Sequence, residues 1–327
     1  MPCPYIESRI QRFSKATMIG TSLTAGFTGI RRRPGLVVLI WAMNLVPAFV
    51  LSVPVAIALG SAVGSTGFDA DLAGGFDLVL WADIIEEAGE ALGALQFQLL
   101  WMIPLYLIWK AAASVGLIHA LRGDDARSFW QGVGRYTGKG VLLGLLFLVL
   151  VLVGVVGLLI VAVGLSAIWP GEVGSFWINF VILPTLAISG LAVLDLMHDY
   201  ARMALVVDEK KVFKATFTGL AWPFKHGQAS GLYVAWFVPA AVLLLLPTVL
   251  DMNVAAATGG AIWGRFLMQQ ILLLLRAAVT VGWFGSETAL YEAIRLREMP
   301  LIAEEEVEVS VASEEMLGSE QGGLASG

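Results

Sequence analysis

Two basic residues, Lys110 and Arg276, lie near the middle of long apolar stretches of this chain. A charge at the centre of a membrane helix costs roughly 2.5–3.5 kcal/mol, so such residues are rare and are functional candidates. Each basic residue belongs to a polar stripe at helical spacing. The two stripes consist of Tyr106, Lys110 and Ser114, and of Gln269, Arg276, Thr280 and Glu287. We expect both stripes to face the inside of a helix bundle.

A third polar group, formed by Asp195, Asp199 and Arg202, falls on one face near the end of another apolar stretch. Asp199 and Arg202 are spaced to form an i, i+3 ion pair. The Lys110 side chain could extend toward Asp195, although their depths differ by roughly 12 Å. Two interpretations remain open for all these residues. They pin helices together through buried ion pairs and hydrogen bonds, or Lys110 and Arg276 line a polar cavity for an anion or a lipid headgroup.

Signatures of catalysis and of metal binding are missing from the sequence. It has no GxSxG, P-loop or dinucleotide motif, and its single cysteine, Cys3, rules out an intrachain disulfide. His119, His198 and His226 fall near predicted helix ends but lack HxxxH or HExxH spacing. We therefore predict no catalytic residue, no metal and no cofactor, and a haem-binding subunit is the weakest alternative.

The elements that position these residues are membrane helices. The chain is 58% hydrophobic and 14% charged, against about 25% charged in soluble domains. Apolar stretches of about 20 residues, enough to cross the ~30 Å hydrocarbon layer, occur six times. They cover residues 35–59, 99–121, 141–169, 176–197, 232–250 and 263–286. The predicted fold is an all-α polytopic membrane bundle, with a basic N-terminal segment (1–34), a transmembrane domain (35–299) and a tail (300–327).

Lysine and arginine gather in alternate connections. They precede the first span and lie between the second and third and between the fourth and fifth, whereas the other loops have none. The positive-inside rule then places both termini in the cytoplasm, and we expect a bacterial inner membrane. Because the basic residues flank membrane spans, nucleic-acid binding is not expected.

The three basic segments share a pattern of aromatic and apolar residues before each odd-numbered span. They read FTGIRRRPGL, FWQGVGRYTGKGVL and FTGLAWPFKHGQASGL. They predict cytoplasmic interfacial amphipathic helices, so that the bundle consists of three hairpins, each entered through such a helix. The alternative is ordinary loops with aromatic anchors.

Three further segments carry predictions of their own. The acidic outer loop, residues 60–98, is predicted to contain an acidic amphipathic helix. The acidic tail at 300–327 is predicted to be disordered. Small-residue steps at Gly134/Gly138 and Gly140/Gly144 suit close helix packing near the third span.

The segments RRRPGLVVLIWAMNL and DYARMALVVDEKKVFKATFTGLAWPFKHG, together with the arginine-bearing last span, carry a resemblance. The chain resembles poorly characterised bacterial six-helix membrane proteins, which look related to the membrane domain that accompanies some glycerophosphodiester phosphodiesterases. We expect no phosphodiesterase domain, and therefore no enzyme activity and no catalytic residues, to follow from this resemblance.

Two functions follow as hypotheses. The first is a non-enzymatic scaffold, assembly or accessory subunit that contacts membrane lipids and other membrane-protein subunits. The second is a transporter or channel for a small anionic solute or lipid, with Lys110 and Arg276 lining the cavity.

Overall fold

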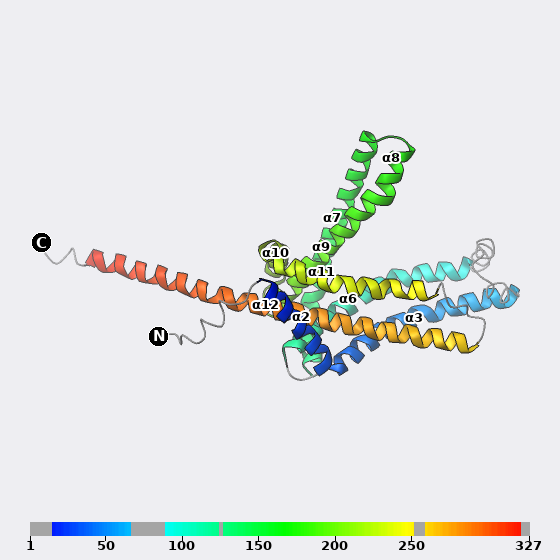
Figure 1. Cartoon of the computed structure of the whole chain (residues 1–327), viewed down its shortest axis with the longest axis horizontal. Coiled ribbons are helices and arrows are strands. Elements are labelled where there is room, and N and C mark those ends of the chain that lie inside the picture. The colour runs from blue at the N-terminus through cyan, green and yellow to red at the C-terminus, as the bar shows by residue number, and fades with distance from the viewer. Residues whose placement is uncertain (1–14, 67–88, 124–126, 252–258, 322–327) are drawn as a thin grey trace.

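A computed structural model describes residues 15–66, 89–123, 127–251 and 259–321 of the chain. All the secondary structure in these ranges is helical, as predicted (Figure 1). The elements are α2 Lys15–Arg32, α3 Pro34–Thr66, α6 Gly89–Arg122, α7 Arg127–Ile168, α8 Glu172–Trp177, the π-helix η1 Ile178–Ile182, α9 Leu183–Val206, α10 Val212–Lys225, α11 Gly227–Asp251 and α12 Gly259–Gln321.

The membrane-spanning character of the helices is confirmed. Five of the described spans are long and apolar enough to cross a membrane, and α2 with α3 forms a sixth candidate that bends by 82° between its two parts. The protein is thus a polytopic membrane helix bundle. The predicted acidic helix of the outer loop falls mostly within residues 67–88, outside the described residues, while residues 60–66 belong to α3 and residues 89–98 to α6.

The three basic segments that precede odd-numbered spans differ in the structure. The first and third contain separate helices, α2 and α10, whereas the second is simply the beginning of α7. The cause is local. Pro34 opens α3 after the break at Arg33, and His226 leaves the helical conformation with φ −124° and ψ 84°. No proline separates residue 127 from residue 141, so α7 continues without interruption.

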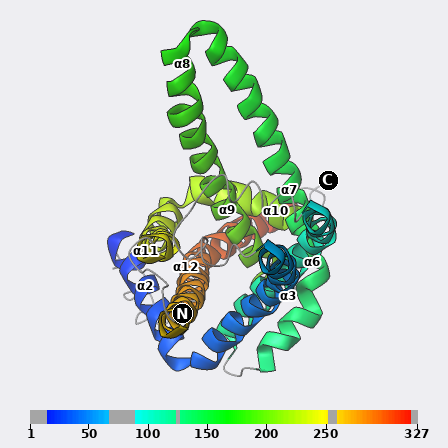
Figure 2. The same cartoon turned by 90° about the vertical axis from the view of Figure 1, so that its right-hand side faces the viewer.

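The hairpin made of α7, α8, η1 and α9 projects away from the other spans (Figures 1 and 2). Only 6% of the apolar window of α7 and 11% of that of the α8–α9 span are buried, against 33% for α6. The π-helical turn ends two residues before Pro184, whose missing backbone N–H cannot complete the regular α-helical pattern. Most of this hairpin therefore offers apolar side chains to its surroundings.

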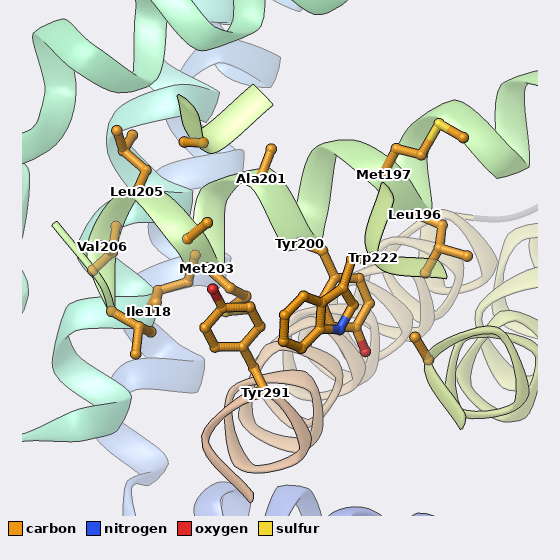
Figure 3. Packing of buried hydrophobic residues seen from close by; sticks show 14 of the residues in the cluster. Ile118, Leu196, Met197, Tyr200, Ala201, Met203, Leu205, Val206, Trp222 and Tyr291 are labelled. Carbon is orange, nitrogen blue, oxygen red and sulfur yellow. The ribbon is translucent and has the colours of Figure 1, made fainter. Parts of the chain in front are cut away.

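The buried core lies where the last turns of α9 meet α6, α10 and α12, as Figure 3 shows. Tyr200, Trp222 and Tyr291 form an aromatic stack there, with ring centroids 5.9 Å apart for Tyr200 and Trp222 and 4.4 Å apart for Trp222 and Tyr291. Met203 and Ile118 are fully buried beside them. Burial of these large side chains holds the helices together at one end of the bundle.

Glycine permits two close helix contacts. A Cβ on Gly26 of α2 would collide with the Gly282 carbonyl and the Ser286 side chain of α12, and one on Gly219 of α10 would collide with α9. Of the small-residue steps predicted from spacing, only part makes a helix contact. Gly134, Gly138 and Gly144 face open space, whereas Gly140 lies against Val115 of α6. Spacing shows that small residues share a face, but not that another helix covers it.

The acidic tail also differs from the prediction. Residues 300–321 continue α12 as helix, whereas residues 322–327 lie outside the described part. Glutamate, alanine, leucine and methionine are good helix formers, so an acidic segment rich in them can extend an existing helix.

Candidate functional site

A cavity of about 500 Å³ lies between α3, α6 and α12. Such a volume is in the range of ligand-binding pockets, about 300–1,000 Å³. Most of the side chains that line it are apolar, including the indole rings of Trp41 and Trp109. The polar lining residues are Asn44, Tyr106, Lys110, Ser114, Arg202, Arg276 and Thr280. The cavity therefore gathers parts of all three polar groups singled out in the sequence.

The two central cations of the cavity come from different helices, Lys110 from α6 and Arg276 from α12. Both residues are exposed to it. Within the described part of the chain, neither side chain forms an ion pair or a hydrogen bond with another side chain. Among the described residues, these two positive charges within membrane spans thus lack an anionic contact partner, which is costly and makes them candidates for contact with a ligand.

Arg202 lines the same cavity but already has partners. Its guanidinium forms the predicted i, i+3 ion pair with Asp199, at 2.6 Å, and contacts Nδ1 of His198 at 3.1 Å. Both residues of the pair are largely buried. Lys110 lies close enough to Asp199 for the two charges to interact. Arg202 therefore serves the fold as well as the cavity.

Two hydroxyl groups of the cavity donate hydrogen bonds to backbone carbonyls of their own helices. Ser114 Oγ donates to the Ala111 carbonyl at 2.9 Å, and Thr280 Oγ1 donates to the Arg276 carbonyl at 3.0 Å. Trp109 Nε1 donates to the Met43 carbonyl at 2.7 Å, which joins α6 to α3 beside the cavity. The hydroxyl lone pairs and the two cations remain available to a ligand.

Besides Asp199, three predicted site residues lie outside the cavity. Gln269 is exposed and does not line the cavity, although it shares a helix face with Arg276. Glu287 is fully buried and accepts a hydrogen bond from Trp283 Nε1 at 2.9 Å. Each lies seven residues or more from Arg276, about 10 Å or more along the helix axis, where the neighbouring residues differ. Asp195 accepts a hydrogen bond from the Tyr233 hydroxyl at 3.0 Å and not from Lys110.

Sequence reasoning missed Asp208, in the turn between α9 and α10. Its carboxylate accepts a hydrogen bond from the Tyr291 hydroxyl at 2.6 Å and pairs with Lys210 and Arg295, both at 2.9 Å. In the sequence, this turn stands out for its lysines, which indicate the orientation of the spans. An acidic pair inside a basic loop was the sign that could have revealed it.

Glu209, the next residue of the same turn, contacts α7. It pairs with Arg135 at 3.0 Å and accepts a hydrogen bond from the Tyr136 hydroxyl at 3.2 Å. Its φ of 52° lies in the left-handed region, which is uncommon for a residue with a side chain. The turn thus connects α7, α9 and α12 through charged contacts. We call Asp208 and Glu209 with their partners the turn network.

His226, which follows α10 and lies outside the spans, contacts Glu298 at 3.4 Å. Burial lowers the pKa of His226, and Lys225 lowers it further, while Glu298 acts in the opposite direction. Within the described residues, no group of three or more His, Cys, Asp or Glu side chains is placed to hold a metal ion.

Comparison of the chain with protein families, with curated proteins and with solved structures finds no match. The functional argument therefore rests on the cavity itself. Two cations beside an apolar wall suit a molecule that carries both an anionic group and an apolar part.

Proposed function

We propose that this membrane protein binds an anionic amphiphile, namely a lipid with a phosphate headgroup, in the cavity between α3, α6 and α12. Lys110 and Arg276 would contact the phosphate, and the apolar lining would hold the upper part of the acyl chains. The observation that carries the proposal is the presence in one cavity of two cations that have no ionic contact with any described residue. A phosphate oxygen can accept from an ammonium and from a guanidinium at once.

The apolar side chains around the cavity support an amphiphile over a small solute. Ile103 of α6 and Leu273 of α12 line the cavity and are also exposed, so they can meet the hydrocarbon phase. A lipid could then reach the cations from the side, without passing through water. A free inorganic anion would gain nothing from these apolar neighbours.

The test is equilibrium binding to the purified protein in uncharged detergent. The probes are short-chain phosphatidic acid, inorganic phosphate and the matching neutral diacylglycerol. We expect phosphatidic acid to bind best, and Lys110→Leu and Arg276→Leu each to weaken it by about tenfold, equivalent to about 1.4 kcal/mol. Lys225→Leu is the matched control, because it removes an exposed charge of α10 that does not line the cavity.

The three probes separate the outcomes. If inorganic phosphate binds as well as phosphatidic acid, the site takes a solute and the lipid proposal fails. Equal binding of diacylglycerol and phosphatidic acid would show that the cations play no part. A scrambling assay with fluorescent phosphatidic acid in liposomes then asks whether the bound lipid is also moved across the membrane.

A second candidate, an accessory or assembly subunit, is favoured by the projecting hairpin. Its two arms bury little of their apolar surface within the chain, which leaves them free to pack against another membrane protein. The particle mass in a mild detergent tests this candidate, measured with and without Leu191→Arg, which places a charge on the exposed apolar surface of the hairpin. A monomeric mass in both cases would argue against it.

For the orientation, the distribution of lysine and arginine supports placing the turn network and α10 on the cytoplasmic side of a bacterial inner membrane. Accessibility of single cysteines introduced at Lys225 and at Glu172 to a membrane-impermeant reagent in spheroplasts tests it. Labelling of the first position but not of the second would overturn the proposed orientation.

A further inference from the structure

We propose that the protein has a second site, which binds a hydrophobic organic cation at Asp195. The site is a groove of about 460 Å³ between α7, α9 and α11. Its lining residues belong to both arms of the projecting hairpin and to α11, and this hairpin diverges from the other spans (Figure 2). The proposal does not depend on the lipid site, because Asp195 does not line that cavity.

The groove contains a negative charge within a membrane span, and none of the described residues that line it is a lysine or an arginine. The Asp195 carboxylate accepts a hydrogen bond from the Tyr233 hydroxyl, and among the described residues it forms no ion pair. Asp195 belongs to the span from Glu172 to Val206 and is exposed to the groove. A carboxylate in the membrane interior needs a positive partner, and a cationic ligand would supply it.

The nearest basic side chains of α9 are already engaged. The Arg202 guanidinium pairs with Asp199 and lines the other cavity. His198 lines the groove and turns its Nδ1 atom to Arg202. Because a guanidinium only donates hydrogen bonds, Nδ1 is the acceptor and the imidazole ring is neutral. Asp195 is therefore the charged group that the groove presents to a ligand.

Aromatic rings form the walls beside Asp195. Phe147 stacks on the ring of His198 at 4.5 Å, and Tyr233 and Phe237 stand on α11 with ring centroids 6.1 Å apart. The faces of such rings attract cations, and more strongly where water is excluded. A carboxylate among aromatic rings is thus suited to a quaternary ammonium or phosphonium group.

Apolar residues extend the groove toward the hydrocarbon phase. Ile188 and Leu191 of α9 line it and are 60% and 52% exposed. A ligand can therefore arrive from the membrane and bury its apolar groups against them. The geometry selects a cation with large apolar substituents over a hydrated metal ion, which would need several oxygen ligands.

The test measures binding of tetraphenylphosphonium to the full-length protein in uncharged detergent. Its probe of equal shape and opposite charge is tetraphenylborate. We expect the phosphonium to bind and Asp195→Asn to weaken it by at least about tenfold. Asp195→Glu, which keeps the charge, should retain most of the affinity. Lys110→Leu, in the other cavity, and Glu172→Gln, an exposed acid outside the groove, should leave it unchanged.

Phosphonium binding that Asp195→Asn leaves unchanged would overturn the proposal, as would tetraphenylborate that competes equally with the phosphonium. Absence of phosphonium binding to the wild-type protein would also overturn it. If Asp195→Asn does not fold, Phe237→Ala takes its place, with loss of binding expected. The lipid proposal stands or falls separately, on phosphatidic acid binding by the wild-type protein.

Discussion

The turn network and the basic cavity use charge in opposite ways. In the turn, Asp208 and Glu209 each contact a basic side chain and a tyrosine hydroxyl from other helices. In the cavity, Lys110 and Arg276 have no ionic contact among the described residues. The turn lies next to the buried core, and the cavity is open.

This contrast separates charges that hold the fold from charges that the proposed function assigns to a ligand. A charge in a stabilising role is paired and hydrogen-bonded, because an unpaired charge away from water costs free energy. Removing a paired group should therefore destabilise the protein. Removing an unpaired group should leave stability unchanged and affect binding instead.

The largest expected effect is that of Asp208→Ala. It leaves Arg295, Lys210 and the Tyr291 hydroxyl without their shared acceptor, so the free energy of unfolding should fall by about 3 kcal/mol. Unfolding in sodium dodecyl sulfate measures this. Glu172→Ala, which removes an exposed acid at the far end of the hairpin, is the control. Equal stability of the two variants would show that the turn network does not hold the helices.

The next effect is that of Gly26→Ala at the contact between α2 and α12. The added methyl meets the Gly282 carbonyl, so we expect a loss of about 2 kcal/mol from overpacking. Gly20→Ala on the same helix faces open space and should instead gain about 0.5–1 kcal/mol from helix propensity. A stabilising Gly26→Ala would mean that α2 does not pack against α12 in this way.

A smaller effect concerns pH and His226. Because burial lowers its folded-state pKa below 6.5, protonation favours the unfolded chain. The contribution of neutral His226 to stability is fully present above the unfolded-state pKa of 6.5. It is lost as the pH falls below 6.5 and through the lower pKa of the folded state. Between about pH 7.5 and pH 5.5 the stability of the wild-type protein should decline slightly more than that of His226→Asn. Identical pH profiles would exclude this contribution.

The smallest effect on stability is expected for Lys110→Leu and Arg276→Leu. Neither change breaks an ion pair within the described part of the chain, so the free energy of unfolding should stay within about 0.5 kcal/mol of the wild-type value or rise. The same detergent titration measures both. A loss as large as that of Asp208→Ala would favour the structural interpretation of these cations. It would contradict the contrast between the turn network and the cavity.

The spans could be predicted because apolar length follows directly from the thickness of the membrane. Their ends could not, because helices continue into polar segments: α7 begins at Arg127 and not at residue 141. The stripes identified Lys110 and Arg276, but apolar spans carry little information about which of them are neighbours. The meeting of α3, α6 and α12 therefore needed the structure. Asp208 was missed because its partners lie on distant helices.

The most direct test of the lipid site is a double-mutant cycle on phosphatidic acid binding with Lys110→Leu, Arg276→Leu and the double variant. If both side chains contact one phosphate, each single change should weaken binding by about tenfold, and the combined loss should depart from the sum of the two. Wild-type affinity in all three variants would contradict the account. Losses that add without coupling would place the two cations at separate ligands.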